Sequence, residues 1–282
     1  MSGEEIIGKL GKLDLSKNPI LEVKELIYDI GQIMYVLYNL YPNKTIIRAR
    51  PEGSLKIISD LSYKPQKFNQ AYQRASTPNK TMFYGCIASE ESLTDAQYIA
   101  AHECSPLLKE KNESNELITE KITYGKWKVI EDIHLITVLH SDCFKEANNS
   151  LLCELNNYYE NFKKKYPDMK QKTEIISEFF ASEFSKNTIK KDYDYMISAF
   201  FTENATNCPS IDGVMYPSVK VEGKFGFNVA IKPDSVDRKM RLNMAMESTI
   251  YKHGKEIFID NDKIAVIQES NANLNYRPID NM

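Results

Sequence analysis

Polar side chains that can hold an anion occur at the ends of two strand-like runs. Arg48 and Arg50 close the run TIIRAR, and Arg74 precedes the turn Ser-Thr-Pro-Asn of YQRASTPNK. Tyr84 lies in the apolar run after this turn. A guanidinium offers parallel donors that fit a phosphate, and a tyrosine ring stacks on a flat group, so these residues could hold a nucleotide. The alternatives are solvated arginines on an exposed edge strand and a core tyrosine, and residue chemistry alone favours them.

Residues 48 and 50 have a further property, because side chains two apart on a strand share a face. Two guanidinium groups on one face repel each other unless an anion or an acid lies between them. One carboxylate stands out elsewhere: Glu103 lies among Ile99, Ala100 and Cys104 at the end of an apolar helical pattern. A carboxylate in such surroundings needs a partner or a function.

The sequence lacks the common local motifs of cofactor and metal sites. Neither GxGxxG nor GxxxxGK[ST] is present, and HExxH is also absent. The four histidines lie far apart, so we expect no metal and no bound cofactor. The five cysteines are scattered without a CxxC pair, which predicts reduced thiols and a cytoplasmic location. A cysteine nucleophile at Cys104 is disfavoured, because His102 lies only two residues away on the same helix.

Composition excludes several classes of protein. The 282 residues carry a net charge of −3, which argues against a dedicated nucleic-acid binder. No run of about 18 apolar residues occurs, so no membrane span is expected. Hydrophobic residues make up 42% and charged residues 27%, which is typical of a folded globular protein.

The elements that must position these side chains alternate in blocks. Apolar spacing predicts a helix over residues 19–41, ending at Pro42, and the alternative to core packing for its wide apolar stripe is a partner-binding face. Strands follow in TIIRAR, SLKIIS, TMFYGCI, ELITEKITYGKWKVI and IHLITVL, with a bulge expected at Gly125 and a helix in LTDAQYIAAHECSPLL. Helices return over 150–204, and strands again in GVMYPSVKV, GFNVAIKP and EIFIDNDKIAVIQES. This order predicts an α+β fold.

Seven segments together resemble the RES-domain family, which is named for its Arg, Glu and Ser residues. They are IIRARP, DLSYKP, YQRASTPNKTMFYGC, AAHECSPLL, EFFASEF, GVMYPSV and GFNVAIKP, and they span about residues 45 to 235. The resemblance implies an ADP-ribosyltransferase-like split β-sheet. It also implies destruction of NAD+ by hydrolysis or phosphorolysis, as in the small bacterial toxins of this family. Toxin members are paired with a helix-turn-helix antitoxin.

The resemblance assigns a role to each polar residue. The first family arginine falls on the Arg48–Arg50 pair, with Arg48 preferred, and the second matches Arg74. The ring tyrosine matches Tyr84 and the acid matches Glu103. The family serine and a recurring asparagine match two further positions, Ser218 and Asn228. The implied site has catalytic Glu103, Arg48 and Ser218, with Arg50, Arg74, Tyr84 and Asn228 binding the substrate.

This chain departs from the short toxins in two ways. They commonly read Gly-Arg-Trp-Asn at the second arginine, where this chain has Gln73-Arg74-Ala75-Ser76. The chain is also longer. We therefore expect an N-terminal helical segment at 1–44, a catalytic domain at 45–240 with a helical insertion at about 150–204, and a C-terminal extension at 241–282 that completes the same domain.

The predicted function is cleavage of the nicotinamide–ribose bond of NAD+, with water or phosphate as the acceptor. NAD+ is then a substrate rather than a cofactor. One alternative is transfer of ADP-ribose to a macromolecule, and another is a non-catalytic NAD+ or ADP-ribose binder. A third is an interaction protein that uses the apolar stripe of the 19–41 helix.

Overall fold

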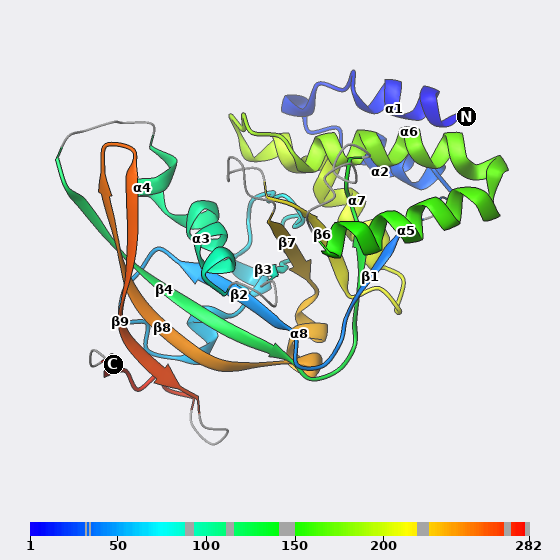
Figure 1. Cartoon of the computed structure of the whole chain (residues 1–282). Coiled ribbons are helices and arrows are strands. Elements are labelled where there is room, and N and C mark those ends of the chain that lie inside the picture. Colours follow the sequence, from blue (N-terminus) through cyan, green and yellow to red (C-terminus); the bar gives the residue numbers. More distant parts are fainter. Residues whose placement is uncertain are drawn as a thin grey trace.

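The computed structural model describes residues 1–31, 33, 35–87, 93–110, 116–140, 150–218, 226–267 and 272–279. These residues form an α+β fold around a ten-stranded mixed sheet with the order β1-β5-β6-β7-β3-β2-β4-β8-β9-β10 (Figure 1). The predicted fold class is thus confirmed at this level. The strands are β1 Leu37–Leu40, β2 Thr45–Arg50, β3 Phe83–Ile87, β4 Ile118–Val129, β5 Ile133–Thr137, β6 Gly213–Pro217, β7 Phe227–Ile231, β8 Met240–His253, β9 Glu256–Val266 and β10 Arg277–Pro278.

Most of the helices gather in two groups, and the short helix α8 lies apart from both (Figure 1). The helices are α1 Gly3–Leu10, α2 Ile20–Asp29, α3 Leu93–Cys104, α4 Pro106–Lys109, α5 Ser150–Lys165, α6 Pro167–Phe184, α7 Met196–Thr206 and α8 Pro233–Lys239. The group formed by α1, α2, α6 and α7 packs on one face of β5, β6 and β7, whereas α3 packs against β2 and β3. Alternation along the strands separates the layers, since Val214 faces the first group and the next residue, Met215, lies in a core cluster on the opposite face.

The sheet consists of two five-stranded halves that meet between β2 and β3. Among the described residues, these two strands pair only through Ile46 with Ile87 and Ile47 with Cys86, although β2 pairs with β4 as far as Arg50. Gly85 allows this close approach, because a Cβ there would lie 2.5 Å from the Ile46 Cγ2 atom. Beyond these pairs the two strands are no longer joined, so the sheet splits.

Three sequence predictions about elements are wrong. The helix predicted over 19–41 is α2, which ends at Asp29, and residues 37–40 form β1 antiparallel to β5. Gly31 adopts a φ of 62° directly after Ile30, a conformation that ends a helix. Of the later apolar positions in β1, Leu40 is buried and Leu37 is exposed. The segment SLKIIS forms no strand, and a 3₁₀ helix spans Ile58–Leu61. The bulge predicted at Gly125 lies instead beside Lys126 and Trp127, where the pairing with β8 skips Asn243.

The C-terminal part completes the sheet. Strand β8 pairs with the whole of β4 and with β9, so residues 241–267 extend one half of the same sheet. The other predicted strands and the helices over 150–204 are present as β2 to β7, β9 and α5 to α7. The predicted N-terminal helical segment therefore contains α1 and α2, but its end belongs to the sheet.

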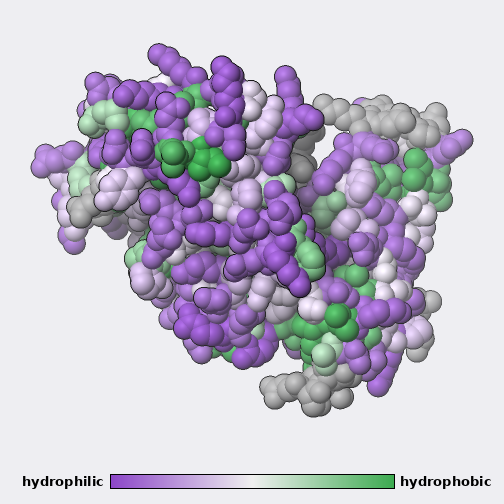
Figure 2. All heavy atoms as spheres, turned by 180° about the vertical axis from the view of Figure 1, so that it is seen from behind, coloured by the Kyte–Doolittle hydropathy of each residue, from purple (hydrophilic) through white to green (hydrophobic). Residues whose placement is uncertain are grey.

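The face of the molecule opposite to the view of Figure 1 is mostly hydrophilic (Figure 2). Seen from behind, hydrophilic residues dominate, and apolar areas are small and dispersed (Figure 2). Within the described residues, none of the helices is both long and apolar enough to cross a bilayer.

Candidate functional site

A pocket of about 430 Å³ opens where β2 and β3 separate. Six of the seven predicted site residues line it: Arg48, Arg50, Arg74, Tyr84, Glu103 and Asn228. Segments that lie up to 180 positions apart in the chain therefore meet in one cavity. The seventh, Ser218, reaches this pocket indirectly, through a hydrogen bond to Glu103.

Arg48 lies where the strand pairing stops. Its Nη1 donates to the Tyr84 carbonyl oxygen at 2.6 Å, just past the last β2–β3 pair, and its guanidinium lies 5.0 Å from the centre of the Phe83 ring. The side chain is 6% exposed, and its buried Nε–H has no acceptor among the described residues. Burial, reinforced by the charge of Arg50, lowers the pKa of Arg48 to about 9. At neutral pH the group is therefore a buried cation short of acceptors, which favours an anion beside it.

Among the described residues, the guanidinium of Arg50 has more hydrogen-bond acceptors than that of Arg48. Its Nε donates to the Asp60 carbonyl oxygen and its Nη2 to the Ser62 carbonyl oxygen, both at 3.2 Å. Burial lowers its pKa, and the nearby carboxylates of Glu52 and Asp60 act in the opposite direction. The segment that contains the 3₁₀ helix thus fixes Arg50 at the pocket wall.

Glu103, at the end of α3, is held by two donors from the other half of the sheet. The Ser218 hydroxyl donates to Glu103 Oε1 at 2.7 Å, and Asn228 Nδ2 donates to the same oxygen at 2.9 Å. The Cys86 thiol donates to Asn228 Oδ1 at 3.0 Å, which fits an amide nitrogen turned toward the carboxylate. Two donors on one oxygen fix the plane of the carboxylate, so its charge has a defined position in the pocket.

Arg74 connects the pocket with the helical layer. Its Nη1 donates to the Phe184 carbonyl oxygen and its Nη2 to the Lys186 carbonyl oxygen, the latter at 3.2 Å. The guanidinium also lies 5.1 Å from the Tyr195 ring centre. These carbonyl groups lie at the C-terminal end of α6, where cations stabilise a helix. A phosphate at Arg74 would therefore compete with existing acceptors.

Tyr84 is anchored through its hydroxyl. That oxygen lies 2.7 Å from Ser76 Oγ and accepts a hydrogen bond from the Ala75 backbone nitrogen at 3.1 Å. Burial raises the pKa of Tyr84 to about 12, so the phenol stays neutral at physiological pH. Its ring lines the pocket in a fixed orientation, which suits it to contact a flat group.

Among the further lining residues, four are charged or aromatic and had no role assigned in the sequence analysis: Lys64, Lys109, Tyr195 and Tyr216. Lys64 lies in DLSYKP, a segment that bears the resemblance but no assigned role. Tyr195 is the last residue of a short 3₁₀ helix, Asp192–Tyr195, that directly precedes α7, and only tertiary packing brings it to the strands. Single lysines and tyrosines of this kind are ordinary surface or core residues until their neighbours are known.

The pocket lining includes Cys86, Cys104 and Glu103, residue types that metal and thiol sites use. The described residues contain no group of three or more His, Cys, Asp or Glu side chains that could hold a metal. Cys104 lines the pocket, but burial raises the pKa of its thiol to about 12, which disfavours the thiolate. The His102 ring contacts the Tyr98 carbonyl oxygen at 2.9 Å through Nδ1.

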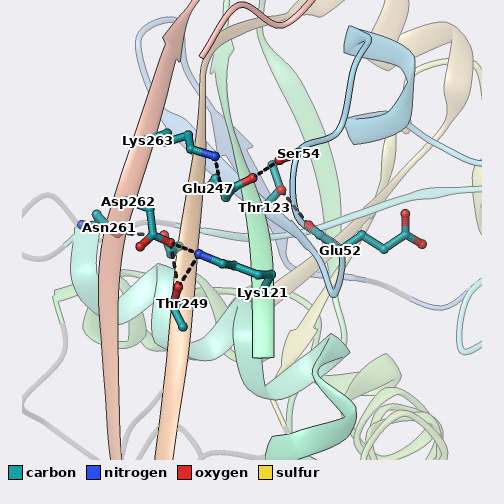
Figure 3. Close-up of polar contacts among 10 residues, drawn as sticks. Glu52, Ser54, Lys121, Thr123, Glu247, Thr249, Asn261, Asp262 and Lys263 are labelled. Atoms are coloured by element: carbon teal, nitrogen blue, oxygen red, sulfur yellow. Dashed lines mark hydrogen bonds and ion pairs between the residues drawn. The ribbon is translucent and has the colours of Figure 1, made fainter. Parts of the chain in front are cut away.

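A second polar cluster stabilises the segment that follows Arg50 (Figure 3). The buried Glu247 carboxylate accepts from Ser54 Oγ at 2.5 Å and pairs with Lys263 Nζ at 2.8 Å. Thr123 Oγ1 donates to the Glu52 carbonyl oxygen at 2.7 Å. Burial alone would raise the pKa of Glu247, but Lys263 and Ser54 outweigh it and hold the pKa below its ordinary value of 4.5. The cluster fastens residues 52–54 onto β4 and β8 and so supports the position of Arg50.

Comparison with known proteins adds no family. No protein-family model matches this chain, and no curated protein matches it. Functional inference therefore depends on the site: one oriented carboxylate, a buried cation with an unused donor, and aromatic rings in a single pocket.

Proposed function

We propose that the protein cleaves the nicotinamide–ribose bond of NAD+, giving nicotinamide and either ADP-ribose or ADP-ribose 1-phosphate. The observation that carries this proposal is the position of Glu103. Its carboxylate is oriented by Ser218 and Asn228 in the same pocket as Arg48, a buried guanidinium with a donor left over. A dinucleotide needs these two features together, a cation for its pyrophosphate and a carboxylate for the charge that develops at the ribose.

The fold supports the proposal as well. The RES-like sequence segments imply an ADP-ribosyltransferase-like sheet that splits at its centre. In the part of this chain that the structure describes, the β2–β3 pairing is limited to two residue pairs, and the pocket opens directly beside them. We therefore propose membership of a longer branch of this family, with residues 45–240 as the core of the catalytic unit.

The proposed reaction follows from the charges. The bond between ribose C1′ and the pyridinium nitrogen breaks, its electron pair returns to the ring, and nicotinamide leaves as a neutral molecule. No general acid is needed. Glu103 stabilises the positive charge on the ribose, by analogy with the carboxylates of glycoside hydrolases. An oxygen of water or of inorganic phosphate then forms the new bond to C1′, and Glu103 accepts the proton when the nucleophile is water.

The supporting residues act on binding and orientation. Arg48 and Arg50 hold the pyrophosphate, while Tyr84 contacts the nicotinamide ring. Ser218 is a positioning residue in this scheme, because its hydroxyl donates to Glu103 and it is not among the residues that line the pocket.

The test is product analysis with a matched variant. Purified protein is incubated with NAD+, with and without inorganic phosphate, beside Glu103→Gln and the control Glu131→Gln, which changes an exposed glutamate. Free nicotinamide that depends on Glu103 supports the proposal, and ADP-ribose or its 1-phosphate identifies the acceptor. Intact NAD+ after long incubation contradicts it. Radiolabel on added proteins, with no free ADP-ribose, would indicate transfer to a macromolecule instead.

The role in a cell is a separate part of the proposal. The resemblance implies a toxin that depletes NAD+ and a helix-turn-helix antitoxin that restrains it. Expression of the wild-type protein should then lower cellular NAD+ and slow growth, and Glu103→Gln should do neither. Growth arrest by both forms would contradict a toxic role based on this reaction.

A further inference from the structure

The pocket is unequal in charge along its length. At one end lie the rings of Tyr195 and Tyr216, with Arg74 already donating to backbone carbonyl groups. At the other end, on the β2 side of the split, lie Arg50 of β2 and two lining lysines, Lys64 and Lys109, the latter on α4, which contacts β4. Arg48 lies between the two ends, because it is part of β2 and donates to the Tyr84 carbonyl oxygen of β3. Glu103 lies beside it on α3, which packs against both β2 and β3, and accepts from Ser218 and Asn228.

Lys64 follows the segment that binds Arg50, and Lys109 lies beside Cys104, whose thiol is close enough to be influenced by the charges of both Lys109 and Arg50. Arg50 Nη2 donates to the Ser62 carbonyl oxygen, two residues before Lys64. Lys109 Nζ donates to the carbonyl oxygen of Cys104 at 3.3 Å, next to Glu103 in the chain. Neither lysine has a carboxylate partner in the part of the chain that the structure describes. Both ammonium groups therefore add positive charge to the Arg50 end of the pocket.

This charge exceeds what NAD+ requires. Five cationic side chains and one carboxylate line the pocket among the described residues. The pyrophosphate of NAD+ carries two negative charges, which Arg48 and Arg50 can match, and Arg74 is committed to α6. The lysines then have no anionic group of NAD+ to bind. A phosphate monoester on the adenosine ribose would add roughly −1.5 to −2 charges.

The lack of a second carboxylate among the described lining residues also favours a dinucleotide with a 2′-phosphate. Sites that select NAD+ over NADP+ commonly place a carboxylate on the adenosine 2′-hydroxyl, whereas basic residues accommodate a 2′-phosphate. Glu103 is the only carboxylate among the described lining residues, and Ser218 and Asn228 hold it at the reaction centre. No lining acid is left to repel a 2′-phosphate at the lysine end.

We propose that Lys64 and Lys109 bind the 2′-phosphate of a dinucleotide, so that NADP+ is the preferred substrate of this pocket. This inference rests on the proposed cleavage reaction. In this arrangement the nicotinamide lies toward the tyrosines, the scissile bond at Glu103 and the pyrophosphate at Arg48 and Arg50. The adenosine ribose then reaches the lysine end.

The experiment compares kcat/KM for NADP+ and NAD+ in the wild type, in the double variant Lys64→Gln/Lys109→Gln, and in the control Lys12→Gln, which changes an exposed lysine outside the pocket. We expect the wild type to prefer NADP+ by about 10-fold or more, corresponding to one or two charge-assisted contacts. The double variant should lose this preference through a higher KM for NADP+, and its kcat/KM for NAD+ should stay within about twofold of the wild type.

The outcomes separate this inference from the proposed reaction. If the wild type cleaves NAD+ and NADP+ with equal kcat/KM, or if the double variant keeps the preference for NADP+, the inference is wrong and the proposed reaction stands. If the double variant instead loses only a dependence on added phosphate, the lysines bind the acceptor and the inference is also wrong. If neither dinucleotide is cleaved, the proposed reaction fails, and thermal shifts decide the inference. A larger stabilisation by NADP+ than by NAD+ that the double variant loses would support it, and equal shifts would refute it.

Discussion

Replacing Glu103 by glutamine tests the proposed reaction with little change in shape. The side-chain oxygen of glutamine can still accept from the Ser218 hydroxyl and from Asn228, which now contact Glu103 Oε1 at 2.7 and 2.9 Å. The substitution therefore removes one negative charge and keeps the local hydrogen bonds. We expect the fold and the affinity for the dinucleotide to be retained while turnover falls.

The size of the loss follows from the charge that the carboxylate would stabilise. For unit charges about 4 Å apart and an effective dielectric constant of about 20, the interaction is about 4 kcal/mol. A barrier raised by about 4 kcal/mol slows the reaction roughly 10³-fold. Ser218→Ala removes only one of the two donors that orient the carboxylate, so a loss nearer 10-fold is expected.

The assay is release of nicotinamide at saturating dinucleotide, with the dissociation constant measured by calorimetry in parallel. The expected pattern is a fall in kcat of about 10³-fold for Glu103→Gln with a dissociation constant within a few-fold of the wild type. If Glu103→Gln retains a kcat within about 10-fold of the wild type, the carboxylate does not carry the reaction and the assignment is wrong. A loss of binding and of thermal stability together would show instead that the charge supports the fold.

Three further predictions concern stability. Arg74→Ala should lower the free energy of unfolding by about 1–3 kcal/mol, and with it the melting temperature, because it leaves the Phe184 carbonyl group at the end of α6 without its donor. An unchanged melting temperature with weaker nucleotide binding would indicate a direct phosphate contact instead. Gly85→Ala should destabilise the fold by roughly 1–3 kcal/mol, since the added methyl would lie 2.5 Å from a side-chain carbon of β2, and chemical denaturation that shows no difference would contradict the tight β2–β3 contact. Glu247 contributes stability above its unfolded pKa that is lost as the pH falls through its lowered folded pKa, so Glu247→Gln should flatten the acid limb of the stability curve below about pH 4.5. An acid limb as steep as in the wild type would show that the Lys263 ion pair is not its source.

Much of the site was predictable because its residues break local patterns. Glu103 interrupts an apolar helix end and so needs a partner or a function on sequence evidence alone, whereas for Arg48 residue chemistry alone favours a solvated side chain and the resemblance selects it. The resemblance then added Ser218 and Asn228, which residue types alone would not select. All four are connected to the pocket, Ser218 only through its bond to Glu103. Their proposed chemical roles stay predictions.

The rest of the site depends on contacts that no local pattern encodes. A lysine such as Lys64 is solvated by default, and only the path of the chain past Ser62 brings it beside Arg50. In the sequence Arg74 is a candidate to bind an anion, but in the structure the packing of α6 supplies carbonyl acceptors for its guanidinium. The error over residues 19–41 has the same origin, because helical spacing of apolar residues also fits a short helix followed by a strand when both are buried.

The split between β2 and β3 connects the fold with the proposed ligand site through Arg48. Where the strand pairing ends, the carbonyl group of Tyr84 accepts from Arg48 Nη1. The same guanidinium keeps a buried Nε–H without an acceptor in the described structure. Substitution of Arg48 would therefore leave the Tyr84 carbonyl group without this donor and would remove the cation at the same time. A loss of activity would not distinguish these two effects. Glu103 lies on α3, outside the strand pairing, so its charge can be removed separately, and it is the residue whose substitution tests the chemistry.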